Sequence, residues 1–173
     1  MQLTWFAGTT FRVHLGGEIV VVDPDGAPAT VRPAELRSGA DKVVEMGEGM
    51  EIDPVSWRPK AAARATDAPT PLEIARIGPS ALLVAAAGEP PLVILGPGEL
   101  PRFGRWADGA VVVLTSGRES LVADATVLLD VARPRLVALA VDDEMLDLAL
   151  EELSEHLDGA GLSALEPGLA LEV

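Results

Sequence analysis

Glycine and proline divide the apolar residues of this chain into short runs. Hydrophobic residues make up 49% of the 173 residues, but 17 glycines and 14 prolines separate them. Runs such as Ile19–Val22, Leu92–Leu95 and Val111–Leu114 have the length of buried β-strands. No run approaches the roughly 20 apolar residues of a membrane-spanning helix. The sequence therefore predicts a β-rich fold without a membrane segment.

The first half of the chain predicts antiparallel strands joined by tight turns. The first meander comprises strand-like runs at 3–6, 10–15 and 18–23, and the second comprises runs at 72–77, 81–86 and 92–95. Between them a short strand is predicted at 42–45, after a polar, Pro-containing excursion. Gly16 and Gly17 form a typical hairpin turn between the second and third runs. The stretch from 53 to 71 is rich in Pro, Ala and Arg, which predicts a connecting loop.

The second half alternates strands and helices. Strands are predicted at 110–115, 136–141 and 169–173, and helices at about 119–132 and 143–157. The apolar face of the second helix consists of Leu146, Ala149, Leu150, Leu153 and Leu157, with Asp142 as its N-cap and His156 in its last turn. Two strand groups flanked by helices predict one α/β domain over residues 1–173, a four-layer αββα sandwich shortened in the middle.

Charge and cysteine content exclude several classes of function. The net charge is -14, and the segment 117–173 holds 13 acidic residues against Arg118, Arg133 and Arg135. Such a surface repels phosphate backbones, so we expect no nucleic-acid partner. The absence of cysteine excludes disulfides, thiolate ligands and a cysteine nucleophile. The first residues lack the features of a signal peptide, which predicts a cytoplasmic protein.

Several segments resemble a known family. They are Leu3–Phe11 (LTWFAGTTF), Gly16–Pro24 (GGEIVVVDP), Ala107–Leu114, Pro134–Val137 and Leu165–Gly168. Together they resemble the metallo-β-lactamase superfamily, and within it the lactonase-like branch that includes the ascorbate-6-phosphate lactonases. The resemblance implies the αββα fold and an ancestry among zinc-dependent hydrolases.

The same resemblance places the family's metal ligands on residues that do not bind zinc. The histidine and aspartate positions of the metal motif fall on Gly47, Gly49, Ile52 and Glu51. The bridging aspartate falls on Pro97, the last histidine near Val141, and a further histidine of the branch on Gly8. Glycine, proline, valine and isoleucine side chains have no donor atoms for zinc. Asp23 alone is retained, and the chain has only two histidines, His14 and His156. We therefore expect no zinc cofactor.

Three functional hypotheses stay open. The first is a non-catalytic protein that binds a small molecule or a protein and self-associates through an uncovered edge. The alternative is a metal-dependent hydrolase whose magnesium or calcium is held by Glu48, Glu51 and neighbouring aspartates such as Asp23. The third is an anion site at Ser116 and Arg118, although helix capping is the simpler role for Ser116. No catalytic residue is assigned.

Overall fold

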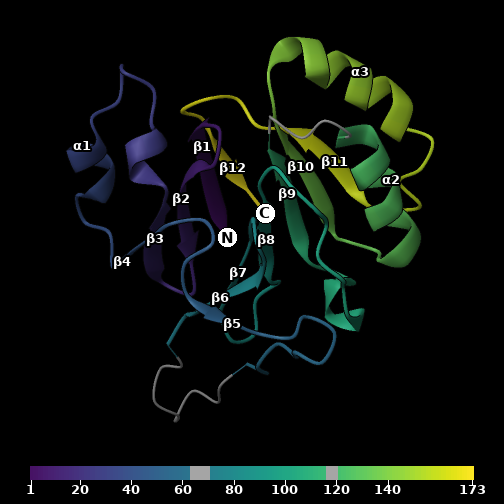
Figure 1. Ribbon diagram of the computed structural model, residues 1–173, viewed down its shortest axis with the longest axis horizontal. Helices are drawn as coiled ribbons and strands as arrows, with labels where there is room; N and C mark the ends of the chain where they lie inside the picture. The colour runs from purple at the N-terminus through teal and green to yellow at the C-terminus, as the bar shows by residue number, and fades with distance from the viewer. Residues whose placement is uncertain (63–70, 116–120) are drawn as a thin grey trace.

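The protein consists of two β-sheets that face each other, with helices on the outside (Figure 1). The computed structural model describes residues 1–62, 71–115 and 121–173. The five-stranded sheet has the order β12-β1-β2-β3-β4. Its strands are β1 (Gln2–Ala7), β2 (Thr10–Leu15), β3 (Glu18–Val22), β4 (Lys42–Val44) and β12 (Ala170–Glu172). The predicted hairpin at Gly16 and Gly17 is confirmed, with φ angles of 61° and 83°.

The seven-stranded sheet has the order β11-β10-β9-β8-β7-β6-β5. Its strands are β5 (Met50–Glu51), β6 (Glu73–Gly78), β7 (Ala81–Ala85), β8 (Leu92–Leu95), β9 (Val111–Thr115), β10 (Leu136–Ala140) and β11 (Gly161–Ala164). Strands β6 to β8 form the predicted antiparallel meander, and β8 to β11 are parallel. Parallel pairing in the C-terminal half is thus confirmed.

Two helices cover part of the outer face of the seven-stranded sheet. They are α2 (Leu121–Val131) and α3 (Asp143–Leu153), and they lie beside β9, β10 and β11 in Figure 1. On the other side of the sandwich the helical layer is reduced to α1 (Pro33–Arg37), with the short 3-10 turn η1 (Pro24–Gly26) near it. The mixed α/β fold with two sheets is confirmed.

The C-terminal helix is shorter than predicted. It ends at Leu153, and His156 lies in the following turn, where its amide donates to Leu153 O at 2.9 Å. The chain then turns through Asp158 and Gly159, both at positive φ, into β11, which the sequence analysis missed. Leu150 is 37% exposed, so its assignment to the buried face was wrong, whereas Ala149 and Leu153 are fully buried.

Both faces of the seven-stranded sheet are buried, which explains its continuous apolar strands. One core lies between the two sheets and includes Leu3, Phe11 and Ile94. The other lies between the seven-stranded sheet and its cover, and includes Leu114 and Leu128. All residues of β7, β8 and β9 are buried, as expected for central strands covered on both faces.

Aromatic residues join the helices in covering the outer face of this sheet. Trp106, in the 3-10 turn η2 (Arg105–Ala107), is 5% exposed and stacks edge-on against Trp57 with ring centroids 5.1 Å apart. Its indole nitrogen donates to Pro54 O at 2.5 Å, and the indole nitrogen of Trp57 donates to Glu73 Oε1 at 2.8 Å. The connecting segment after β5 is therefore fixed to the sheet by indole rings.

Candidate functional site

Turns and strand ends from both sheets meet at one edge of the sandwich. Thr9 lies in the β1–β2 turn, Asp23 follows β3, Met46 follows β4 and Gly96 follows β8. A Cβ atom placed on Gly96 would lie 3.4 Å from both Thr9 Cγ2 and Met46 Cε, so the three residues are in contact. We call these four residues the strand-end edge. The candidate residue Asp23 lies here, and Pro97, on which the resemblance places the family's bridging aspartate, follows Gly96.

Asp23 fastens this edge through its carboxylate and its backbone. Its Oδ2 accepts from the Thr9 hydroxyl, and its Oδ1 accepts from the amide of Met46 at 2.7 Å. The hydroxyl of Thr10 donates to Asp23 O at 2.7 Å, and the Asp23 amide donates to Val44 O at 3.0 Å. Asp23 has a φ of 43°, a left-handed conformation that aspartate tolerates better than most residues. Both carboxylate oxygens are thus engaged by the protein itself.

The segment onto which the resemblance places the family's histidines includes an edge strand. Met50 and Glu51 pair with Ala75 and Arg76 of β6 as the short parallel strand β5. The Arg76 guanidinium donates to Gly47 O at 3.2 Å and forms an ion pair with Glu51 at 2.5 Å. Sequence analysis identified the acidic residues of this segment but missed the strand. A strand of two residues, Met50 and Glu51, is too short to show a periodic pattern in the sequence.

The acidic candidate residues of this segment lie in different surroundings. Glu48 lines a groove of about 430 Å³ between β4 and β6, together with Lys42, Val43, Val44, Gly49, Leu72 and Ile74. Glu51 is exposed and paired with Arg76. Asp53 accepts hydrogen bonds within its own turn, and those from the Ser56 side chain and the Val55 amide lower its pKa.

Ser116 and Arg118 lie outside the described residues. The structure describes β9 up to Thr115, whose buried hydroxyl donates to Leu95 O at 3.1 Å. Their proposed role at an anion site stays a prediction.

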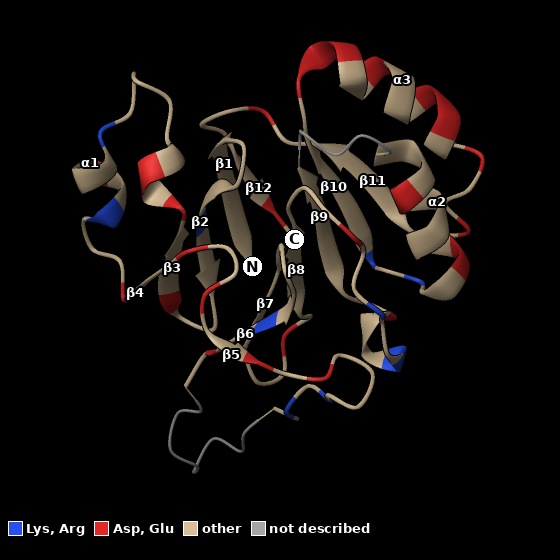
Figure 2. Cartoon of the chain, in the orientation of Figure 1, with Lys and Arg blue, Asp and Glu red and all other residues tan. Residues whose placement is uncertain are grey.

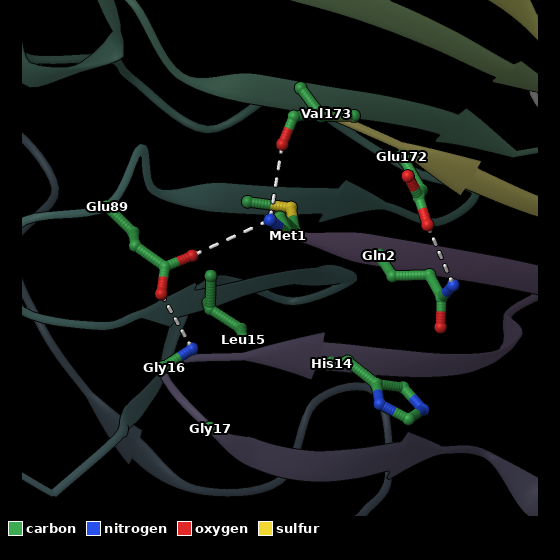
Figure 3. Close-up of a pocket in the computed structure, with 9 residues that line it drawn as sticks. All are labelled: Met1, Gln2, His14, Leu15, Gly16, Gly17, Glu89, Glu172 and Val173. Carbon is green, nitrogen blue, oxygen red and sulfur yellow. Dashed lines mark hydrogen bonds and ion pairs between the residues drawn. The ribbon is translucent and has the colours of Figure 1, made fainter.

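The two histidines lie away from Asp23. His14 lies on β2, in register with Gln2 of β1, and lines a cavity of about 610 Å³ (Figure 3). Glu89 spans one side of this cavity, accepting from the Gly16 amide at 2.9 Å and facing the Met1 ammonium at 3.7 Å. Gln2 Nε2 donates to Glu172 Oε1 at 3.4 Å. Sequence analysis missed this cavity, because it depends on the pairing of β1 with β12.

Solved structures of two proteins share the arrangement of sheets and helices. A Thermotoga maritima protein of the metallo-β-lactamase superfamily, proposed to be a zinc-dependent hydrolase, matches with a TM-score of 0.55 and 14% identity. The match covers 96% of this chain and 99% of that chain. Igni18, a metallo-hydrolase of the archaeon Ignicoccus hospitalis, matches with a TM-score of 0.52 and 12% identity over 99% of this chain and 98% of its own. This chain has the metallo-β-lactamase fold. No protein-family model and no curated protein matches the sequence.

The described residues of this metallo-β-lactamase fold do not offer a donor set for zinc. Structural zinc needs four ligands and catalytic zinc three, drawn from His, Cys, Asp and Glu. Within residues 1–62, 71–115 and 121–173, no three such side chains are grouped closely enough to hold a metal ion. Asp23, the one family position that is retained, already accepts hydrogen bonds from the Thr9 hydroxyl and the Met46 amide. Among the described helices, none is long and apolar enough to cross a membrane.

Proposed function

We propose that this chain is a non-catalytic protein of the metallo-β-lactamase fold that acts by binding a small molecule or a protein. The observation that carries the proposal is the position of Asp23, whose two carboxylate oxygens hold Thr9 and the Met46 amide together. In this arrangement the retained aspartate connects two turns of the five-stranded sheet. A metal ion bound by one of these oxygens would have to share it with the hydrogen bond that the oxygen already accepts.

Two further points belong to the same proposal. The chain descends from the lactonase-like branch and has lost the histidines of its metal motif, as the residues at positions 47, 49 and 52 indicate. We also place it in the cytoplasm, since a chain without cysteine fits a reducing compartment.

Metal content tests the proposal directly. Protein purified without chelator is expected to contain far less than one zinc, magnesium, manganese or calcium ion per chain by inductively coupled plasma mass spectrometry. A stoichiometric ion that Glu51→Gln removes, and that the exposed control Glu166→Gln retains, would instead establish the carboxylate-based hydrolase. In that case the ion pair with Arg76 would have to open on metal binding.

Self-association is the second testable part. Val43 is 45% exposed and Met50 is 70% exposed. They lie on β4 and β5, which are edge strands of the two sheets beside the Glu48 groove. Sedimentation velocity is expected to show an average mass that rises with protein concentration. Met50→Glu should shift the protein toward monomer, while Val127→Glu on α2 serves as a matched apolar-to-acidic control. A monomer at every concentration would contradict this part.

A further inference from the structure

The outer surface of α3 carries strong negative charge. The segment from 142 to 158 contains no Lys or Arg and eight acidic residues, namely Asp142, Asp143, Glu144, Asp147, Glu151, Glu152, Glu155 and Asp158. Figure 2 shows these acidic positions along the helix and in the turn that follows it. Among the described residues, Asp158 has an ion pair, with Arg133 at 3.4 Å, and Asp142 caps the helix by accepting from the Met145 amide at 3.2 Å. The remaining carboxylates face solvent.

Three of these side chains form a row along α3, and a fourth, Glu155, continues it in the turn that follows the helix. Asp143, Asp147, Glu151 and Glu155 follow each other at intervals of four residues, so each lies next to like charge. Such pairs destabilise a helix, and a helix that merely covers a sheet would gain from alternating signs. Here the helix is held by burial of Ala149 and Leu153. The row therefore carries an electrostatic cost that cations from outside would relieve.

The row ends in a groove between α2 and α3. The groove has a volume of about 490 Å³ and is lined by Val122, Thr126, Glu151, Glu152, Glu155 and His156. Leu148 lies one helical turn before Glu152 on the same side of α3 and is 48% exposed. Val122 is partly buried against the outer core. The groove thus sets Val122, its aliphatic lining residue, across from three carboxylates, and Leu148 adds exposed aliphatic surface on α3 beside it.

We propose that the α2–α3 groove binds a basic amphipathic helix of a partner protein. A helix laid in this groove can set aliphatic side chains against Val122 and Leu148 and Lys or Arg side chains against Glu151 and Glu155. A simple polycation would satisfy the carboxylates but leave the aliphatic surface exposed. None of the helices in the described part of the chain is such a helix for a second copy, because α2 and α3 contain no Lys or Arg and α1 has five residues.

This surface goes beyond the proposed function at the strand-end edge. The groove lies in the helical layer outside the seven-stranded sheet, whereas Asp23 follows a strand of the other sheet. Metal content at the strand-end edge and helix binding at the groove can therefore succeed or fail separately.

The probe for this test is a synthetic peptide of about 18 residues, long enough for a helix, with Leu and Lys placed at helical periodicity. We expect fluorescence anisotropy to show binding that weakens with added salt, and circular dichroism to show a gain of helix on mixing. Glu151→Gln combined with Glu155→Gln is expected to weaken binding about tenfold, as two lost charge contacts imply. Thermal unfolding of the variant verifies that α3 still folds.

Two comparisons decide whether the groove is responsible. The control variant Glu99→Gln with Glu166→Gln removes the same charge from exposed positions elsewhere and should change affinity less than twofold. A second peptide with the same residues in an order that gives no apolar face should bind far more weakly. Equal weakening by both variants, or equal binding of both peptides, would overturn the proposal and leave α3 as a solubilising surface.

Discussion

Replacing Asp23 with alanine is expected to lower the free energy of unfolding by about 4 kcal/mol or more. The carboxylate accepts from the Thr9 hydroxyl and the Met46 amide, and a hydrogen bond to a charged group contributes about 1.5–3 kcal/mol. Both donors are partly buried and would lose their acceptor. Alanine also tolerates the φ of 43° less well than aspartate, which adds about 1 kcal/mol. Urea denaturation followed by circular dichroism measures the change.

Asp23→Asn separates the hydrogen bonds from the backbone effect. Asparagine tolerates the left-handed conformation, its Oδ1 can still accept from Met46, and its amide can donate to the Thr9 hydroxyl oxygen. We expect a loss of about 1 kcal/mol, and no change in metal content for either variant. An alanine variant as stable as the parent would show that Asp23 does not fasten the edge. An Asp23→Asn variant that loses a bound metal would point to a ligand role.

The predicted strands with strong apolar runs were found, whereas elements without such runs were missed. Strand β2 occupies Thr10–Leu15 as predicted, with Phe11, Val13 and Leu15 buried in alternation. Strand β11 was missed because Gly161–Ala164 has one large apolar residue and is held by parallel pairing with β10. Strand β5 has two residues, and its partner β6 lies more than 20 residues later. These elements depend on tertiary pairing, which local patterns do not reveal.

The sequence named candidate residues but did not reveal how they are arranged. The family resemblance set Asp23 apart as the one retained position, and its role at a binding site stays a prediction. The sequence did not reveal that Glu51 pairs with Arg76 rather than lying with Asp23, because that contact joins residues 25 positions apart. The acidic character of α3 was visible in the composition, but the groove beside it required the packing of two helices.

Replacing Trp106 with alanine is expected to cost about 3–5 kcal/mol, the range for a large aromatic residue removed from a core. Trp106 is 5% exposed, and its ring meets Trp57 at 5.1 Å and Phe103 at 6.3 Å. Its indole nitrogen also donates a hydrogen bond to Pro54 O. Loss of the ring therefore removes both apolar contact and the attachment of the segment after β5. Urea denaturation measures the global effect.

The local effect distinguishes this role from general core loss. Trp5 is 6% exposed and belongs to the inter-sheet core, so Trp5→Ala is a matched control for lost burial. Trypsin cuts after Lys60, which lies in the segment that Trp106 holds through Pro54, whereas Pro59 protects the bond after Arg58. Under native conditions, cleavage after Lys60 is expected to be faster in Trp106→Ala than in Trp5→Ala at similar global stability. Equal cleavage rates would mean that the segment is held by Trp57 and its bond to Glu73, and that Trp106 contributes only packing.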